Sequence, residues 1–322
     1  MITSDPTLSQ LIADEIARPL PSAIDALTAE IRRRHGDAVA AILFYGSCLR
    51  KNTLEGVLDF YVVVDSYRAA YASSLLTLLN TALPPNVFYL EAQAGQQTLR
   101  AKYAVISQAD FQRAATLQSV HAIVWGRFCQ PFLLAYARNE QAKTLIAQAA
   151  TEAILTLVAR TVTLLLSDHD VWEFHSETLW QTGFHETYRS ELRPEHPATV
   201  RSLYEAAAER YDHIASIALH LLARRGFLHL LQENRSLIVT MDERTCRRVR
   251  NSWRRRLPLA KGLYALRLLK SAFTFGDWLP YALWKLQRHT GVQVELTERQ
   301  RRHPLIWGWP VIFKLLARRD LH

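Results

Sequence analysis

Apolar positions in the first third of the chain fall into two spacings, which predict helices and buried strands in succession. Residues 8–34 carry apolar side chains at helical spacing with a break at Pro19 and Pro21, so two helices are predicted. The continuous apolar run AVAAILFY at 38–45 is typical of a buried strand and ends at a Gly-Ser turn. The segment LDFYVVVD at 58–65 is rich in valine and aromatic residues and predicts a second buried strand.

Shorter patterns continue the alternation of strands and helices. A helix is expected over 69–79, strands over 87–91 and 102–107, and an almost wholly helical region over 111–225. This order predicts an α+β fold, in which a mixed sheet is followed by a mainly helical region.

The most apolar stretch of the chain, at 144–166, is interrupted by Glu152 and Arg160. A membrane span needs about 20 apolar residues with few or no charges. We therefore predict that this stretch is a helix buried in the protein core.

Composition favours a folded intracellular protein. Of the 322 residues, 49% are hydrophobic and 21% are charged, a balance that argues against a disordered chain. The three cysteines lie far apart without a CxxC pair, which argues against a disulfide framework or a thiolate zinc site and favours a reducing cytosol. Acidic residues near the start of the chain interrupt the pattern that an export signal needs, so no export signal is expected.

The net charge of +9 is concentrated at one end of the chain. Residues 241–322 contain 18 Lys and Arg against 6 Asp and Glu, or +12, which leaves 21 against 24, or −3, for residues 1–240. Such asymmetry predicts that the C-terminal part meets a polyanion, either nucleic acid or an anionic membrane surface.

The turn after the first predicted strand joins groups suited to phosphate and metal. Gly46 lets the backbone approach a phosphate closely, and Ser47 adds a hydroxyl donor. Asp59, after eleven intervening residues, can hold the divalent cation that bridges triphosphate oxygens. A Gly-Ser pair alone also occurs in ordinary strand turns, so the prediction rests on the pair, its strand context and the Asp59 spacing together.

This combination resembles the polymerase-β-like nucleotidyltransferase superfamily, which implies a palm-like mixed sheet and a Mg²⁺-dependent reaction. The superfamily usually places a second carboxylate two residues after the first, where this chain has Tyr61. Asp65, at the far end of the same strand, and Glu91, at the end of the third strand, are the candidates for further metal ligands, although such strand-end carboxylates are more commonly solvated.

Later segments extend the resemblance over most of the chain. Together with YGS and LDFYVVVD they look like the mitochondrial-type phosphatidate cytidylyltransferase family, including its bacterial relatives, and they occur in the same order. These segments are AKYAVIS at 101–107, WGRFCQP at 125–131, TYRSELRPE at 187–195 and YALWKLQRHTGV at 281–292. The family makes CDP-diacylglycerol from CTP and phosphatidate.

The resemblance implies a role for each matching side chain. Gly46 and Ser47 would bind the triphosphate of CTP, and Arg127 would assist them. Asp59 would bind Mg²⁺, and Lys102 would offset phosphate charge, because nucleotidyl transfer depends on positioning and on stabilising charge at nonbridging oxygens. Without the resemblance, Lys102 and Arg127 would be interpreted as ordinary surface cations.

Two further arginines, Arg189 and Arg193, lie four residues apart in TYRSELRPE and share one face of a predicted helix. With the resemblance they suit the phosphate of the acceptor, phosphatidate. They suit salt bridges on an exposed helix equally well.

The C-terminal part interleaves arginine with aromatic residues. The segment RTCRRVRNSWRRR at 244–256 has seven arginines, and PLIWGWPVIF at 304–313 is too short to span a membrane but has the tryptophans favoured at membrane interfaces. Arginines near an anionic leaflet contribute about 1 kcal/mol each. The pattern favours attachment to a membrane surface; the alternatives are binding of single-stranded nucleic acid and a solvated basic helix followed by a packed core.

The sequence thus predicts a nucleotidyltransferase domain at 1–110, a helical domain at 111–240 and a basic, aromatic, membrane-associating region at 241–322. The predicted activity is a Mg²⁺-dependent transfer of CMP from CTP to phosphatidate at an anionic membrane surface. The predicted location is cytoplasmic and peripheral on the inner face of the membrane, with no nucleic-acid partner. The alternatives are a nucleotidyltransferase acting on RNA or another nucleic acid and, because of Tyr61, a membrane-bound adaptor with an inactive transferase fold.

Overall fold

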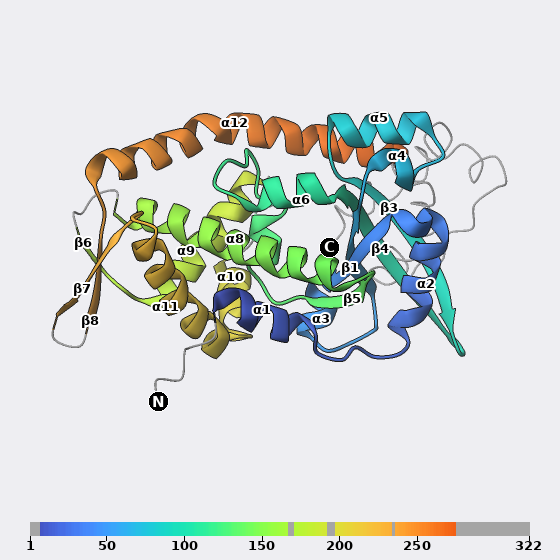
Figure 1. Ribbon diagram of the computed structural model, residues 1–322, viewed down its shortest axis with the longest axis horizontal. Helices are drawn as coiled ribbons and strands as arrows, with labels where there is room; N and C mark the ends of the chain where they lie inside the picture. The colour runs from blue at the N-terminus through green and yellow to red at the C-terminus, as the bar shows by residue number, and fades with distance from the viewer. Residues whose placement is uncertain (1–6, 167–170, 192–196, 234–235, 275–322) are drawn as a thin grey trace, which may run out of the picture. The chain divides into compact units, whose positions relative to one another are not determined.

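The computed structural model describes residues 7–166, 171–191, 197–233 and 236–274, all within one compact unit, Met1–Thr274. The chain has a mixed α+β fold, and Figure 1 shows the order of its elements. The helices are α1 (Leu8–Ile16), α2 (Ile24–His35), the 3₁₀ turn η1 (Gly36–Ala38), α3 (Ser47–Arg50), α4 (Tyr67–Ala70), α5 (Ser74–Ala82), α6 (Gln108–Ala115), α7 (Trp125–Phe128), α8 (Glu140–Leu165), α9 (Ser176–Ser190), α10 (Pro197–Glu205), α11 (Ala208–Arg224) and α12 (Glu243–Thr274). The strands are β1 (Val39–Tyr45), β2 (Val57–Val64), β3 (Asn86–Ala94), β4 (Gln97–Ser107), β5 (Leu133–Ala137), β6 (Val171–Glu173), β7 (His229–Glu233) and β8 (Ser236–Thr240).

The main sheet has five strands in the order β3-β4-β2-β1-β5. Strand β2 is antiparallel to β1 and parallel to β4, while β3 and β5 pair antiparallel with β4 and β1. The register places Tyr45, the last residue of β1, opposite Asp59 of β2, and Asp59 opposite Lys102 of β4. The end of β1 therefore meets the first halves of β2 and β4 at one edge of the sheet.

The two faces of the main sheet belong to different hydrophobic cores, because successive strand residues point to opposite sides. Phe60 and Val62 of β2 lie in the core that includes the apolar side of α2. Tyr61 and Val63 lie in the larger core, which includes α1, α6, α7 and α8. The carboxylate of Asp59 lies on the same face as Tyr61, and so on the side of the larger core.

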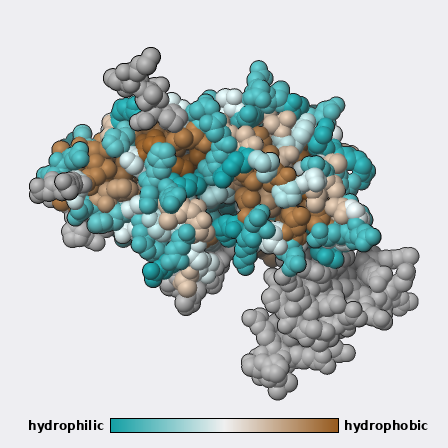
Figure 2. Space-filling model, turned by 90° about the horizontal axis from the view of Figure 1, so that it is seen from below, coloured by the Kyte–Doolittle hydropathy of each residue, from teal (hydrophilic) through white to brown (hydrophobic). Residues whose placement is uncertain are grey.

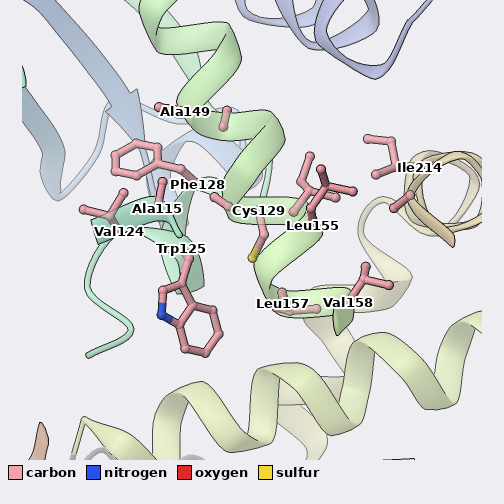
Figure 3. Packing of buried hydrophobic residues seen from close by; sticks show 14 of the residues in the cluster. Ala115, Val124, Trp125, Phe128, Cys129, Ala149, Leu155, Leu157, Val158 and Ile214 are labelled. Atoms are coloured by element: carbon pink, nitrogen blue, oxygen red, sulfur yellow. The ribbon is translucent and has the colours of Figure 1, made fainter. Parts of the chain in front are cut away.

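Helix α8 passes through the larger core. Its N-cap is Asn139, whose side-chain oxygen accepts a hydrogen bond from the backbone N–H of Ala142 at 2.9 Å. By length and hydropathy α8 is long and apolar enough to cross a membrane, but 83% of its most apolar window is buried inside the protein. Figure 3 shows Leu155 and Leu157 of α8 in the same cluster as Trp125 of α7. The buried helix predicted at 144–166 is confirmed.

The buried cation of α8 is held by aromatic rings and carbonyl groups. The Arg160 guanidinium lies 5.1 Å from the ring centroid of Trp125 and 4.2 Å from that of Trp253 on α12. It donates hydrogen bonds of 2.9 Å to the carbonyl oxygens of Leu117 and Ser119. Burial lowers the pKa of Arg160 to about 9, with a further contribution from a neighbouring arginine. This arrangement links α8 to α12.

Helix α12 follows a small sheet of order β6-β8-β7 and packs against α8, α9 and β3 (Figure 1). Near its C-terminal end, Arg267 Nε donates to the Pro84 carbonyl at 2.7 Å. Lys270 Nζ donates to the carbonyls of Leu83 and Pro85. Burial lowers the pKa of Arg267 to about 10 and that of Lys270 to about 7. These contacts hold α12 beside α5 and β3.

Three local features differ from the sequence prediction. The helix expected over 69–79 is two helices, α4 and α5, because Tyr71 is extended and Ser73 caps a new helix. The strands expected over 87–91 and 102–107 are longer and form a hairpin, with Gly95 at a φ of +62° in its turn. Strand β5 lies in the stretch expected to be helical, where it pairs with β1 at the edge of the main sheet.

The predicted boundaries at residues 110 and 240 lie inside the unit Met1–Thr274, and β5 brings a later segment into the main sheet. The arginine-rich segment 244–256 forms the first half of α12. The segments 281–292 and 304–313 lie outside the described residues.

Candidate functional site

A cleft of about 330 Å³ lies at the edge of the sheet where β1 ends. Strands β1, β2 and β4 supply its first wall, and α3, α7, α9 and α12 supply the rest. The side chains and backbone that line it are those of Tyr45, Gly46, Ser47, Arg50, Asp59, Lys102, Arg127, Gln130, Pro131, Tyr188 and Tyr264. Five of the sequence-predicted site residues, Gly46, Ser47, Asp59, Lys102 and Arg127, are therefore brought together.

Gly46 makes the sharp turn from β1 into α3, with a φ of +93° and a ψ of −161°. Residues with a side chain rarely adopt this conformation. A Cβ atom at this position would also lie 2.8 Å from Oδ2 of Asp59. Glycine is thus required twice, for the backbone angles and for the close approach of the turn to the Asp59 carboxylate.

Asp59 and Lys102 form an ion pair across the parallel strands β2 and β4. Nζ of Lys102 lies 3.3 Å from Oδ1 of Asp59, and the side chains are 43% and 25% exposed, respectively. Because the two residues are direct partners in the strand register, the backbone ladder fixes their spacing. Both groups are accessible to a ligand in the cleft.

Arg127 is fixed by a two-pronged ion pair with Glu191. Its two terminal nitrogens donate to the two carboxylate oxygens at 2.5 and 2.9 Å, and one also donates to the Ile123 carbonyl at 3.1 Å. Burial opposes the charge of Arg127, but the Glu191 carboxylate and the phenols of Tyr61 and Tyr45 outweigh that effect, so its pKa is raised well above the usual value. A permanent cation therefore stands in this wall of the cleft.

Several lining residues were not singled out from the sequence. Tyr45, Gln130 and Tyr188 lie within the segments that carry the resemblance, so a signal for them existed. Arg50 follows the Gly-Ser turn by one helical turn. Tyr264 comes from α12, where no local motif marks it. Burial, with the nearby Asp59 charge, raises the pKa of Tyr45 well above its usual value, so this phenol stays protonated.

The other predicted metal ligands lie elsewhere. Asp65 follows the opposite end of β2, where Arg138 donates to its two oxygens at 2.6 and 2.9 Å and lowers its pKa. Glu91 lies on the edge strand β3 and accepts hydrogen bonds from Tyr89 at 2.7 Å and Arg100 at 3.2 Å. Neither carboxylate lines the cleft.

The predicted acceptor arginines are not part of the described cleft either. Arg189 on α9 is half exposed and lies 3.4 Å from Glu186, an ion pair on the helix surface. Its neighbour Tyr188 lines the cleft instead. Arg193 lies outside the described residues.

A second pocket, of about 390 Å³, adjoins the cleft, and the two share Arg50 and Pro131. Its walls are mostly apolar and come from α1, α3, α10 and α11, with Arg18 and Arg210 among its charged side chains. Figure 2 shows one face of the molecule, on which polar residues predominate and apolar residues gather in separate patches.

The site fits a magnesium ion that arrives with phosphate oxygens. Magnesium is typically bound by one or two carboxylates, water and substrate phosphates rather than by a complete protein cage. Within the described residues, no group of three His, Cys, Asp or Glu side chains is placed to hold a metal, and Asp59 is the single carboxylate in the cleft lining. Gly46 keeps the space next to Oδ2 of Asp59 open.

No protein-family model matches this chain, and no curated protein sequence matches it.

Proposed function

We propose that this chain is a nucleotidyltransferase that transfers CMP from CTP to phosphatidate, giving CDP-diacylglycerol and pyrophosphate. The proposal is carried by one observation: the predicted site residues line the same cleft. It contains Gly46, Ser47, Asp59, Lys102 and Arg127, which come from four separate segments of the chain. Each of these residues has a role in the transfer implied by the resemblance, and the fold brings all of them to one cleft of about 330 Å³.

The charges in the cleft suit a bound triphosphate. In the described part of the chain, three cations, Arg50, Lys102 and Arg127, and one carboxylate, that of Asp59, line it. Fixed cations that face the nonbridging oxygens stabilise the charge that develops during phosphoryl and nucleotidyl transfer. The Gly46 turn brings backbone close to these phosphates without a side chain between them.

The carboxylate of Asp59, together with triphosphate oxygens and water, would hold Mg²⁺. A magnesium ion there supplies Lewis-acid stabilisation of the triphosphate charge. Lys102 and Arg127 hold positive charge at two further positions around the same phosphates, and the Glu191 carboxylate keeps the guanidinium of Arg127 in place.

In the proposed reaction, an oxygen of the phosphatidate phosphate attacks the α-phosphorus of CTP in line. The new P–O bond forms as the bond between the α-phosphorus and its bridging oxygen breaks, and pyrophosphate leaves with that electron pair. A phosphate dianion is a nucleophile at neutral pH, so no separate general base is needed.

The lipid acceptor requires contact with a membrane surface, and α12 with α5 provides apolar and basic groups for it. Leu266 and Leu269 of α12 and Leu75 and Leu78 of α5 are between 52% and 65% exposed. The hydrogen bonds of Lys270 hold the two helices side by side (Figure 1). Exposed arginines precede these leucines on α12. Apolar insertion with nearby arginines favours an anionic bilayer, so the proposed location is peripheral, on the inner face of the cytoplasmic membrane.

The direct test is transfer of label from α-labelled CTP to lipid in the presence of Mg²⁺ and phosphatidate vesicles. Wild type should place label in the lipid phase, and Asp59→Asn should reduce the rate by about 10²-fold or more. Asp65→Asn and Glu91→Gln are matched controls, because both carboxylates are paired outside the cleft. An unlabelled lipid phase with wild type, or equal rates for wild type and Asp59→Asn, contradicts the proposal; label in added RNA supports the nucleic-acid alternative.

Membrane binding is tested separately by flotation with phosphatidate-rich vesicles. The double variant Leu266→Gln, Leu269→Gln should float less than wild type. Leu231→Gln is the control, since Leu231 is also 50% exposed but lies on β7 of the small sheet. Equal flotation of both variants contradicts the assignment of this surface.

A further inference from the structure

Among the described residues, Asp59 is the single carboxylate that lines the cleft, whereas many phosphoryl-transfer sites hold two cations. We propose that the cleft binds one divalent cation with the nucleotide and that the Lys102 ammonium takes the place of a second cation. The inference rests on the proposed nucleotidyl transfer and specifies how its charge is balanced. Three observations lead to it.

The first observation is the position of Lys102. In the register of the parallel pair, Lys102 is the direct neighbour of Asp59, and their charged atoms are 3.3 Å apart. Two carboxylates at these positions would lie on adjacent strands on one face, a spacing suited to sharing metal ions. The chain instead places the Lys102 ammonium beside Asp59, the carboxylate in the described lining of the cleft.

The second observation concerns Tyr61, the next residue of β2 on the same face as Asp59. Its side chain is 2% exposed and packs against the rings of Tyr45, Phe111 and Phe128. Its hydroxyl donates to the Ile123 carbonyl at 3.2 Å, and burial raises its pKa. A charged ligand at this depth would lie among aromatic rings without solvent. The position is therefore part of the core, and it supplies no metal ligand.

The third observation is that Glu191, behind Arg127, and the two other candidate ligands, Asp65 and Glu91, are already paired with arginines. Both oxygens of Glu191 accept hydrogen bonds from Arg127, and both oxygens of Asp65 accept from Arg138. Glu91 is paired with Arg100 on the edge of the sheet. To bind a second cation, one of these carboxylates would have to give up its arginine.

The chemical consequence is that two different cations balance the phosphate charge: a divalent ion that binds with the nucleotide, and the ammonium of Lys102, which is part of the protein. Asp59 would contact the divalent ion bound with the triphosphate. The Lys102 ammonium has three donors and enough exposure to contact nonbridging oxygens of the transferred phosphate. Lys102 then stabilises the negative charge on the transferred phosphate, so a second metal ion is not needed there.

The test counts Mn²⁺ ions by electron paramagnetic resonance in the full chain saturated with the nonhydrolysable α,β-methylene analogue of CTP. We expect one bound Mn²⁺ per protein–nucleotide complex. Two bound ions in a complex that contains the nucleotide would overturn this inference and leave the proposed transfer standing. Failure of the analogue to bind, measured first by calorimetry, would overturn both.

Variants of Lys102 test whether this residue determines the number of bound Mn²⁺ ions. Lys102→Asp places a second carboxylate beside Asp59 and should raise the count from one to two. Lys102→Ala should keep one ion, while its turnover falls by about 10²- to 10³-fold. Lys51→Asp makes the same charge change at an exposed position outside the cleft lining and should leave both quantities unchanged. A count that stays at one in Lys102→Asp would overturn the assignment of this position.

Discussion

The Gly46→Ala substitution tests the geometry of the cleft most directly. The added Cβ would lie 2.8 Å from Oδ2 and 3.3 Å from Cβ of Asp59. An ordinary van der Waals contact begins near 3.4 Å, so the carboxylate must move by roughly 0.6 Å. The backbone of Gly46, at φ +93° and ψ −161°, lies in a region that costs a residue with a side chain about 1–3 kcal/mol.

These two effects have separate readouts. The backbone cost should lower the melting temperature by about 2–10 °C for a unit of this size. The displacement of Asp59 should lower the rate of CMP transfer by roughly 10- to 100-fold, since a misplacement of about 1 Å in a reacting group commonly costs 10²-fold. The assays are thermal unfolding followed by circular dichroism, and transfer of label from CTP to lipid.

The matched control is Gly95→Ala. Gly95 also has a positive φ, +62°, but a Cβ there meets no atom within 4 Å, and the residue lies in the turn between β3 and β4. Gly95→Ala should lose stability and keep its transfer rate. If Gly46→Ala transfers CMP at the wild-type rate, or if Gly95→Ala loses activity to the same degree, the proposed role of the Gly46–Asp59 contact is wrong.

Three further predictions concern groups behind the cleft. Glu191→Gln leaves Arg127 charged without its counter-ion and should lower the free energy of unfolding by about 3–5 kcal/mol in urea titrations; a loss below 1 kcal/mol would contradict the pairing. Tyr61→Phe should cost only about 0.5–1.5 kcal/mol and keep its transfer rate, because the Ile123 carbonyl retains a bond from Arg127; a large loss of turnover would show that the phenol takes part in the reaction. Burial lowers the pKa of His121 to about 3, so between pH 6.5 and 3 the unfolded chain binds a proton that the folded chain does not, and stability falls as the pH falls. His121→Gln should show a shallower loss of stability in that window, and an unchanged slope would contradict the burial of a neutral imidazole.

The part of the cleft formed by Gly46, Ser47 and Asp59 could be predicted from the sequence because these residues are close together in the chain. The run into Gly46 and Ser47 and the strand that carries Asp59 are local patterns, and a short connection between buried strands predicts that they pair. Asp65, a candidate for a further metal ligand, lies far from Asp59 along the same strand. It stands six positions after Asp59, which is about 20 Å of extended strand at 3.3 Å per residue.

The positions of Lys102, Arg127 and Tyr264 in the cleft depend on contacts that no local sequence pattern encodes. Lys102 faces Asp59 only because β4 pairs parallel to β2 in one particular register. Arg127 is held by Glu191, which is 64 residues further along the chain. Tyr264 reaches the cleft because α12 returns across the fold to the main sheet. Patterns of hydrophobic spacing define elements, whereas these contacts depend on how the elements pack.

The attachment of α12 has a further consequence for the cleft. Asp59 on β2 and Lys102 on β4 form the floor of the cleft. Their strands are joined by a continuous ladder of backbone hydrogen bonds, so the floor is as rigid as the sheet. Tyr264 instead follows α12, whose end is held by Lys270 at the carbonyls after α5. With a pKa of about 7, Lys270 changes protonation close to neutral pH. Relative to the intrinsic exchange rate at each pH, the amides of the floor should therefore stay strongly protected, while the protection of the α12 wall should change as Lys270 loses its charge.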